Sequence, residues 1–434
     1  MNVLVVGGGA REHALAWAVR RGGADRTVIC VPGNAGIAAV AECLPGDPTA
    51  VQALADLARS RRVDLTIVGP EAALAAGLAD ELERRGMKVF GASRAAAEIE
   101  TSKIFSKEFM RRHGIPTAGF DVADSPAGAA RILAKRGERA SVVKADGLAA
   151  GKGVVVASTR REAEEAVAAM LVERRFGAAG DRILIEDRLT GPEVSFFALC
   201  DGERARALTT CQDYKRLEDG DRGPNTGGMG GYSPSVLVDP ALERAVLDRI
   251  IEPTVRGLAR EGRPYRGVLY AGLMLTPEGP RVLEYNARFG DPEAELIAVR
   301  LASDLVEVIE ATLAGRLDDA PLRFHPGGAV CVVLAAAGYP ATPRTGDPIE
   351  GLEPEGDGDG VVVFHAATRA REGRVETAGG RVLTVTARAE NLAGARRRAY
   401  SAVAGIRFPG MQHRRDIAAF ASGPGSGVSG RFPL

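Results

Sequence analysis

Lysine is scarce in this 434-residue chain: seven of its 56 basic residues are lysine and the other 49 are arginine. On an ordinary surface arginine replaces lysine freely, but it does not where a compact ammonium has to meet a phosphate oxygen as a point charge. The remaining lysines are therefore enriched for sites that require lysine. Four of them stand in segments that suggest such sites: Lys103, Lys144, Lys152 and Lys215. We expect the other three, Lys88, Lys107 and Lys135, to lie on the surface.

Several other features are missing, and each absence argues against a class of protein. The five cysteines form no CxxC pair and no metal-ligand spacing, so we expect reduced thiols in buried strands. The formal net charge is zero, which argues against a nucleic-acid or membrane-surface partner. The sequence has no run of eighteen apolar residues and no signal-like leader, so we expect a soluble cytoplasmic protein.

The first hundred residues alternate between buried strands and helices, which is typical of a parallel α/β sheet. Strands are expected at 2–6, 27–31, 65–69 and 88–91, and a helix at 10–21. The glycine turn at 7–9 suggests a dinucleotide site, but the third fingerprint position holds Glu12 and no acid follows the second strand. Such a turn at a helix N-terminus still suits a single phosphate.

Ligands of parallel sheets bind in the loops at the carboxyl ends of the strands. The residues that stand in these loops are Gly9, Arg11, Glu12, Asn34, Gly69 and Glu71. We predict that they contact a ligand; the alternative is that they only shape turns.

The segment 142–157 combines two β-branched runs with a loop of small residues, so it predicts a strand–loop–strand hairpin. Its glycines leave backbone N–H groups unshielded and lysines flank them, an arrangement that suits polyphosphate oxygens. These residues are Lys144, Gly147, Gly151, Lys152 and Gly153. The spacing differs from that of a Walker A loop, and a strand follows instead of a helix. The alternative is a hairpin whose lysines are only solvated.

Further candidates lie on either side of this hairpin. Lys103 stands in the first turn of a predicted helix, where a cation opposes the helix dipole, so we expect a negative group beside it. The strand predicted at 183–187 leads past Glu186 and Leu189, whose backbone groups suit an adenine edge. Glu193 follows within reach of a ribose. Two exposed acids in a hairpin are the alternative.

Residues 209–234 contain six glycines and almost no apolar periodicity, so we predict a long loop. A loop of this length inside a compact domain is usually functional or disordered. Asp213 and Lys215 at its start favour a functional loop.

Two strands are predicted next, at 267–275 and 280–285. Glu284 and Asn286 point to one face, as residues two apart on a strand do. A carboxylate beside an amide oxygen suits Mg²⁺, which completes its shell with phosphates and water. Arg288 shares this face while the chain stays extended, and would neutralise a transferring phosphoryl group. In another context such a pair would carry no meaning.

The remainder, 326–418, predicts a small α/β domain with three strands and a helix at 391–405. His365 lies in one of these strands, and we expect it to pack in the core instead of acting as a base. The glycine- and serine-rich segment 421–434 is expected to be a flexible tail.

Eight segments in this order resemble the ATP-grasp superfamily and, within it, the phosphoribosylamine–glycine ligase family. They are GGGAREHALAW, VPGNAG, DLTIVGPE, KADGLAAGKGV, QDYKR, GPNTGGMGGYSP, EYNARFGDPE and GGRVLTVTA, and the resemblance runs from about residue 2 to 418. It implies an α/β fold of several domains. The implied parts are a Rossmann-like domain over 1–101, a central ATP-grasp domain over 102–120 and 189–325, a lid over 121–188, a C-terminal domain over 326–420 and the tail over 421–434.

The resemblance also implies roles for the residues singled out above. ATP is expected at Lys103 and Lys144 with the hairpin residues Gly151, Lys152 and Gly153, and at Glu186, Leu189 and Glu193. Mg²⁺ or Mn²⁺ is expected at Glu284 and Asn286. Gly9, Arg11 and Glu71, with Glu12, Asn34 and Gly69, would lie toward 5-phosphoribosylamine. Asp213, Lys215, Arg288 and Asp291 would lie toward glycine and its acyl phosphate.

The chain departs from the family pattern in three places. Ala10 stands where the family has glycine, which adds a methyl near the expected ligand. Ala294 and Glu295 replace the usual Thr and Gln, so we assign them no role. The strand GVLYAGLML carries no acid, so the metal would be held by fewer protein oxygens than in many ATP-grasp enzymes.

The implied activity is ligation of glycine to 5-phosphoribosylamine through glycyl phosphate, at the expense of ATP, by a monomer. Positioning and charge neutralisation would supply most of the catalysis, and no covalent enzyme intermediate is needed. Another ATP-grasp ligase would keep the nucleotide residues but change Asp213 and Lys215. A non-catalytic nucleotide sensor would keep the fold but not Glu284 and Asn286. A nicotinamide oxidoreductase would need the acid that is missing after the second strand.

Overall fold

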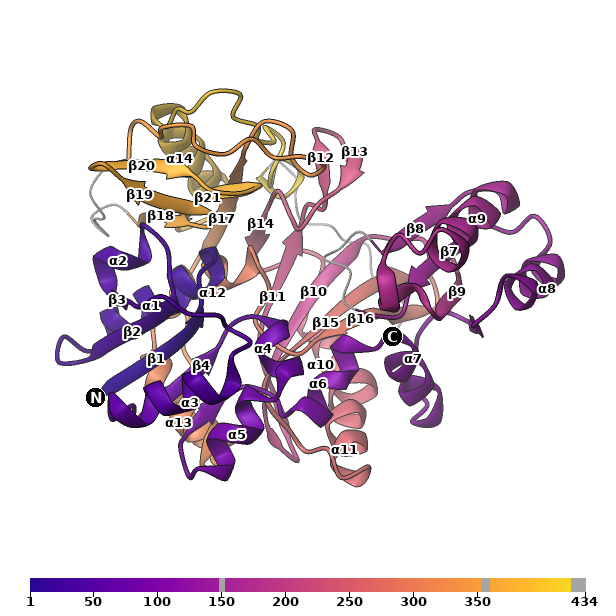
Figure 1. Cartoon of the computed structure of the whole chain (residues 1–434), viewed down its shortest axis with the longest axis horizontal. Helices are drawn as coiled ribbons and strands as arrows, with labels where there is room; N and C mark the ends of the chain where they lie inside the picture. The colour runs from indigo at the N-terminus through magenta and orange to yellow at the C-terminus, as the bar shows by residue number, and fades with distance from the viewer. Residues whose placement is uncertain (148–152, 353–359, 423–434) are drawn as a thin grey trace.

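The computed structural model describes residues 1–147, 153–352 and 360–422. Figure 1 shows a parallel sheet near the N-terminus, a long sheet through the middle and a small sheet that projects to the right. The predicted α/β class with several parts is confirmed. Gly151, Lys152 and the predicted tail beyond residue 422 lie outside the described residues.

The N-terminal sheet has five parallel strands in the order β3-β2-β1-β4-β5. They are β1 (Asn2–Gly7), β2 (Thr27–Pro32), β3 (Glu42–Cys43), β4 (Leu65–Val68) and β5 (Val89–Phe90). The four predicted strands are all present, because sheets buried on both faces read as continuous apolar runs. Strand β3 was not predicted, since two residues leave no pattern. The helices are α1 (Ala10–Gly22), α2 (Ile37–Val40), α3 (Val51–Ser60), α4 (Glu71–Ala76), α5 (Leu78–Arg84) and α6 (Arg94–Thr101).

The central sheet has eight antiparallel strands in the order β16-β15-β10-β11-β14-β17-β21-β18. They are β10 (Glu193–Gly202), β11 (Ala205–Asp213), β14 (Gly230–Ser233), β15 (Tyr265–Thr276), β16 (Gly279–Asn286), β17 (Gly328–Ala335), β18 (Val361–His365) and β21 (Arg381–Ala389). The three strands predicted beyond residue 326 are present, and β14 joins them to the central strands through β17. The C-terminal segment therefore shares one continuous sheet with the centre of the molecule.

Helices cover this long sheet. They are α7 (Lys103–Arg112), α10 (Pro240–Val246), α11 (Glu252–Arg260), α12 (Glu293–Arg300), α13 (Leu305–Leu313) and α14 (Leu392–Gly405). A π-helical turn, Leu247–Ile251, joins α10 to α11, so the three form one continuous helical segment. Side chains cap several of these helices: Ser102 accepts from the Phe105 N–H group and Asn391 from that of Gly394.

The prediction of a long loop over 209–234 is wrong. This stretch holds the end of β11, the ribbon β12 (Arg216–Glu218) and β13 (Arg222–Asn225), and all of β14. Strand β14 pairs with β11 and also with a strand far along the chain, since Gly231 lies opposite Cys331, while the largely exposed β12 and β13 pair with each other. Local periodicity therefore gave no sign of it. A second ribbon, β19 (Thr368–Arg371) with β20 (Arg374–Thr377), lies in the C-terminal part.

The small sheet spans residues 120–187, which we call the lid after the lid predicted over 121–188, and it has a core of its own. Its four antiparallel strands, in the order β6-β9-β7-β8, are β6 (Phe120–Ala123), β9 (Ile183–Asp187), β7 (Ser141–Ala145) and β8 (Val154–Ala157). The pairing of Val142 with Val156 confirms the predicted hairpin. Helices α8 (Pro126–Arg136) and α9 (Arg160–Val167) pack on it through Leu133 and Ala163. Helix α9 passes directly into a π-helical turn, Ala168–Val172.

The N-terminal sheet and the central sheet share a hydrophobic core. Leu4 and Val6 of β1 belong to the same buried cluster as Val194 of β10 and Leu269 of β15. Truncating a fully buried leucine such as Leu269 to alanine costs about 2–5 kcal/mol. This shared core fixes the N-terminal loops relative to the central strands.

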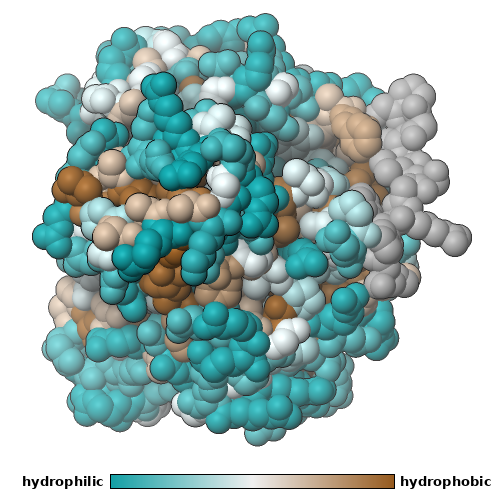
Figure 2. Space-filling model, turned by 90° about the vertical axis from the view of Figure 1, so that its right-hand side faces the viewer, coloured by the Kyte–Doolittle hydropathy of each residue, from teal (hydrophilic) through white to brown (hydrophobic). Residues whose placement is uncertain are grey.

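His365 and most of the cysteines are buried, as expected from the sequence. His365 is buried, and its backbone N–H donates to His13 Nδ1, which supports a packing role. All five cysteines are free thiols, four of them buried. In the described part of the chain no helix combines the length and apolar character needed to span a membrane. Figure 2 shows the lid side of the molecule, where polar residues cover most of the surface and hydrophobic residues are scattered among them.

Candidate active site

Glu284 of β16 lies at the centre of a group of lysines. Burial raises the pKa of its carboxyl, but the ammonium groups of Lys215, Lys144 and Lys103 outweigh this effect and hold the pKa below its usual range. Lys215 lies two residues beyond β11, Lys144 lies in lid strand β7 and Lys103 lies in the first turn of α7. Three of the four lysines singled out by composition thus converge on one carboxylate.

A buried bridge ties Lys144 to a second lysine. Glu186 Oε2 lies 3.0 Å from the Nζ atoms of both Lys144 and Lys107, and Lys144 also donates to the Leu283 carbonyl at 3.3 Å. The prediction that Lys107 lies on the surface is wrong: it is 2% exposed, because the buried face of α7 carries it inward. Burial lowers the pKa of Lys107 to about 8. Glu186 Oε1 is buried and accepts no hydrogen bond from the described residues.

Lys103 is held at the junction of α7 and the lid hairpin. Its Nζ donates to the Gly147 carbonyl at 3.1 Å, and burial lowers its pKa. Asp146 Oδ1 accepts from the Ser102 hydroxyl at 2.9 Å and from the Ile104 N–H at 2.8 Å. Asp146 is therefore the negative group expected beside this helix N-terminus.

Glu284 and Asn286 form a half-buried pair on β16, two residues apart on one strand as predicted. Gly272 stands opposite Glu284 on β15, and a Cβ built there would lie 3.6 Å from Glu284 Cγ. No cluster of three or more acidic, His or Cys ligands occurs among the described residues. A carboxylate and an amide two residues apart on one strand fit a hard divalent cation that takes its other ligands from phosphates and water.

Arg288 lies beyond the end of β16, and acids hold its guanidinium from two sides. Its Nε donates to Glu71 Oε2 at 3.2 Å, and its Nη2 lies 3.0 Å from Glu100 Oε1. Although burial opposes the charge, Glu100 and Glu71 raise the pKa of Arg288. The extended backbone that the sequence analysis assumed for Arg288 ends at Asn286, so this side chain connects β16 to the N-terminal segment.

The N-terminal glycine turn is shaped by Glu12. Its carboxylate accepts from the Gly9 N–H at 2.7 Å and from Arg11 Nε at 2.6 Å. Gly69 packs against it so closely that a Cβ there would lie 2.0 Å from Glu12 Oε1. The methyl of Ala10 is fully buried in the core, so the expectation that it approaches a ligand is wrong.

Asn34 shapes the neighbouring loop in the same way. Its Oδ1 accepts from the N–H groups of Gly36 and Ile37, both at 2.9 Å. Its Nδ2 donates to the carbonyls of Gly8 at 3.0 Å and His365 at 2.7 Å. The Asn34 side chain is thus engaged within the protein, while Glu71 and Arg11 lie at the edge shared with Arg288.

Carboxylates also lie close to a second glycine turn, at Gly227 and Gly228, which passes the end of β11. Gly228 has φ +112°, and a Cβ there would lie 2.8 Å from Asp213 Oδ1 and 2.7 Å from Pro292 Cδ. Burial and Glu293 raise the pKa of Asp213, whose Oδ1 accepts no hydrogen bond from the described residues. Asp291 Oδ2 would lie 3.6 Å from a Cβ at Gly9, so this acid faces the N-terminal turn.

The remaining predicted residues border these groups. Lys215 Nζ lies 3.6 Å from Glu193 Oε2, which brings the predicted ribose contact next to the predicted glycine contact. Gly153 closes the base of the hairpin, where its carbonyl accepts from the Ala145 N–H at 2.8 Å. Leu189 is half-buried just beyond β9.

Four residues of the site were missed by sequence reasoning. They are Glu100, Lys107, Glu293 and Arg381. Lys107 carried a usable signal, because it is one of seven lysines and stands four residues after Lys103, on the same helix face. The others are distinguished by partners far away in sequence, such as Ser195, whose hydroxyl donates to Glu293 Oε1 at 3.0 Å.

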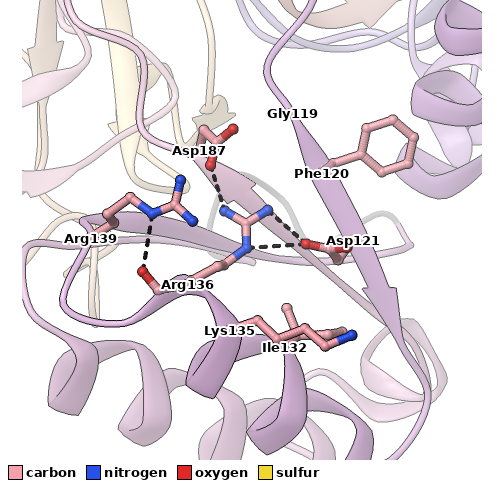
Figure 3. Close-up of a pocket in the computed structure, with 8 residues that line it drawn as sticks. All are labelled: Gly119, Phe120, Asp121, Ile132, Lys135, Arg136, Arg139 and Asp187. Atoms are coloured by element: carbon pink, nitrogen blue, oxygen red, sulfur yellow. Dashed lines mark hydrogen bonds and ion pairs between the residues drawn. The ribbon is translucent and has the colours of Figure 1, made fainter.

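A separate cavity of about 340 Å³ lies on the lid, away from these groups. Figure 3 shows that Arg136 crosses it and pairs with Asp121 and Asp187, at 2.9 and 2.7 Å. Lys135, exposed as predicted, borders it. None of the predicted site residues line this cavity, so it is distinct from the candidate active site.

Comparison with known proteins agrees with this geometry. The family models for phosphoribosylglycinamide synthetase match residues 1–100 (N domain), 101–294 (ATP-grasp domain) and 329–420 (C domain). A phosphoribosylamine–glycine ligase of Rhodopirellula baltica is 48% identical over 423 residues, covering 96% of this chain and 97% of that protein.

Solved structures show the same relationship. The crystal structure of a phosphoribosylamine–glycine ligase from Thermotoga maritima has a TM-score of 0.84 and 34% identity, covering 96% of this chain and all of that one. A biotin carboxylase from Campylobacter jejuni, at 13% identity with a TM-score of 0.74, shares the fold over 99% of this chain and 97% of its own. The chain therefore belongs to the phosphoribosylglycinamide synthetase family.

Proposed function

We propose that this chain joins glycine to 5-phospho-D-ribosylamine in an ATP-dependent reaction that yields glycinamide ribonucleotide, ADP and phosphate, the second step of de novo purine synthesis. The observation that carries the proposal is the convergence of Lys103, Lys144 and Lys215 on Glu284, between the lid and the central sheet. A site that gathers several ammonium groups around one carboxylate suits a metal-bound polyphosphate. The names of the relatives support the two amino substrates.

The lid and the residues that lie beside it would bind ATP. Lys103 and Lys144 would hold phosphate oxygens, and a phosphate at Lys144 would compete with the carboxylate of Glu186. The backbone of Glu186 and Leu189 would meet the adenine, and Glu193 the ribose. Glu284 and Asn286 would hold Mg²⁺ or Mn²⁺, which when bound would offset negative charge on the phosphates.

Ligation then requires glycine to attack the γ-phosphate, giving glycyl phosphate, before the amine of phosphoribosylamine attacks the acyl carbon. Lys215 and Asp213 suit a small zwitterion, since one offers an ammonium group to a carboxylate and the other offers carboxyl oxygens to an ammonium group. Asp291 and Arg288 would adjoin the acyl phosphate. Gly9, Arg11 and Glu71, at the edge of the N-terminal turn, would meet the phosphoribosylamine, with Glu12, Asn34 and Gly69 shaping that turn.

The thiols do not favour a covalent alternative. Burial raises the pKa of Cys30, Cys200, Cys211 and Cys331, so these groups stay protonated and weakly nucleophilic. Positioning and charge neutralisation are then the main catalytic effects.

The proposed domain boundaries are 1–101, 102–120 with 189–325, 121–188 and 326–420. The separate core of the lid and the family matches that change at residue 100 support them. We also propose that the protein works as a cytoplasmic monomer on small molecules, without a nucleic-acid or membrane partner.

The test is the substrate dependence of ADP release in the presence of Mg²⁺. The proposal expects steady turnover only with glycine and phosphoribosylamine together, and an unchanged rate without glycine would refute it. Turnover with another carboxylate and amine, but not with these two, would favour a different ATP-grasp ligase.

A further inference from the structure

Arg381, at the start of β21, reaches from the C-terminal part of the chain into the candidate active site. Its Nη1 donates to the carbonyl of Gly227 at 2.7 Å and to that of Asp291 at 2.8 Å. Its Nη2 lies 3.0 Å from Asp291 Oδ1. Tyr339, also from the C-terminal part, accepts a hydrogen bond from the Gly227 N–H at 3.0 Å. Two C-terminal side chains thus hold both backbone groups of one glycine.

The backbone that Arg381 holds lies against the carboxylate of Asp213. Gly228 follows Gly227 directly, and the space beside its Cα is filled by Asp213 Oδ1 and by Pro292, the residue after Asp291. The turn therefore lies between two acids, and Arg381 fixes the turn and one of these acids at once. A shift of the turn would therefore alter its contacts with Asp213 and with Pro292.

Charge explains why an arginine is needed at this point. Asp291, Glu295 and Asp213 all stabilise the cation of Arg381, although its burial opposes charge. The planar guanidinium can donate to two carbonyls and approach a carboxylate simultaneously, which a lysine ammonium on a flexible stem does poorly. The acid cluster is thus kept together by one multidentate cation.

We propose that Arg381 is a positioning residue for the amino-acid substrate: it sets the Gly227–Gly228 turn and Asp291 so that, with Asp213, they receive the ammonium group of glycine. Asp213 Oδ1, which packs against Gly228 and is buried without a hydrogen-bond donor among the described residues, is the acceptor beside this turn for that group. This inference rests on the proposed function. It gives the C-terminal part of the chain a direct influence on glycine binding.

The experiment compares Arg381→Met and Arg381→Lys with Arg388→Met, a control on the same strand whose side chain donates no hydrogen bond to the described residues. Steady-state kinetics would be measured separately for glycine, phosphoribosylamine and ATP, together with thermal melts. We expect Arg381→Met to raise the KM for glycine about tenfold or more. The KM for ATP should stay within about twofold, because the nucleotide lysines do not contact Arg381. Arg381→Lys should recover part of the loss and Arg388→Met should match the parent.

Other results would overturn the inference. An unchanged KM for glycine in Arg381→Met, or equal increases for all three substrates, would show that Arg381 has only a structural role. A larger rise in the KM for phosphoribosylamine than in the KM for glycine would show that Arg381 positions phosphoribosylamine instead. If Arg381→Met unfolds, Arg381→Lys decides by the same comparison of KM values. Failure of the parent to use glycine would refute the proposed function instead, so the two failures are distinguishable.

Discussion

Lysines and arginines in this site are held in different ways. Lys103 donates only to one carbonyl among the described residues, Lys144 pairs with Glu186, and Lys215 lies 3.6 Å from Glu193. Arg288 is held by two carboxylates and a carbonyl, and Arg381 by one carboxylate and two carbonyls. The lysines surround Glu284, while the arginines connect backbone segments from distant parts of the chain.

This difference follows from the chemistry of the two side chains. Guanidinium is a rigid fork that satisfies several acceptors at once, so it suits permanent positioning. Ammonium is a compact charge with few fixed directions, so it can exchange a protein acceptor for a ligand oxygen. In a chain that contains 49 arginines, the few lysines therefore mark the places where a ligand is expected.

The largest effect is expected from Glu284→Gln, which removes the carboxylate around which the lysines gather. Ligation should fall by more than about 100-fold, because the only charged group of the proposed metal pair is lost. The fold should remain, since no other described residue depends on this side chain for a hydrogen bond. Turnover at saturating Mg²⁺ and circular dichroism would check both statements. Activity within tenfold of the parent would mean that the metal binds elsewhere.

A smaller effect is expected from Lys107→Met, which leaves Glu186 with Lys144 as its single partner. Losing one charge-assisted contact costs about 1.5–3 kcal/mol. The pKa of Lys107 in the folded state, about 8, lies below its ordinary value of 10.5, so the unfolded chain binds more protons between these values. This group therefore makes the parent more stable as pH rises from about 8 to 10.5. The free energy of unfolding of Lys107→Met should lack this rise between pH 8 and 10.5.

The measurement is the difference in free energy of unfolding between parent and Lys107→Met at pH 7, 8, 9 and 10. Lys88→Met, at an exposed surface pair, is the matched control. A difference that does not change with pH would contradict the titration of Lys107 in this range.

Glu295→Gln tests the acid cluster and should have the smallest effect, with a favourable sign. Burial and the neighbouring Asp291 raise the pKa of Glu295, and neither carboxylate oxygen accepts a hydrogen bond from the described residues. The folded state thus binds more protons, and stability is lost as pH rises above the unfolded pKa. Gln removes this loss, so the variant should be more stable than the parent by about 1–3 kcal/mol at neutral pH and less so at pH 5. Denaturant melts at both values would check this; equal stability at pH 7 would contradict it.

Much of the fold was predictable because its signals are local. Continuous apolar runs predicted the parallel strands, and two β-branched segments predicted the lid hairpin. The start of α14 was predicted at Asn391, the residue that caps it. Strand β14 was not predictable, because one of its two partners, β17, lies about a hundred residues away. The same reason hid the continuity of the central sheet into the C-terminal part. The ribbon β12–β13 pairs with itself, but its largely exposed residues show no apolar alternation.

The candidate site, like the fold, was predictable from the sequence only in part. Residue type and scarcity pointed to Lys103, Lys144 and Lys215, and strand spacing to Glu284 with Asn286. Sequence could not show that Glu12 and Asn34 are engaged inside their own loops, since this depends on where neighbouring backbone groups lie. It also could not show Arg381, whose three acceptors come from two other segments.

Titration of ATP into the parent, Lys144→Arg and Lys135→Arg tests most directly the claim that the scarce lysines mark the nucleotide site. Both variants exchange one cation for another, which the composition of this chain would treat as mild. The account predicts that Lys144→Arg weakens ATP binding by roughly 10- to 100-fold, because a longer planar group replaces the ammonium beside Glu284. Lys135→Arg, on the exposed surface of the lid, should bind ATP as the parent does. Equal affinity for Lys144→Arg and the parent, with both folded, would contradict the role of Lys144 and the inference from lysine scarcity.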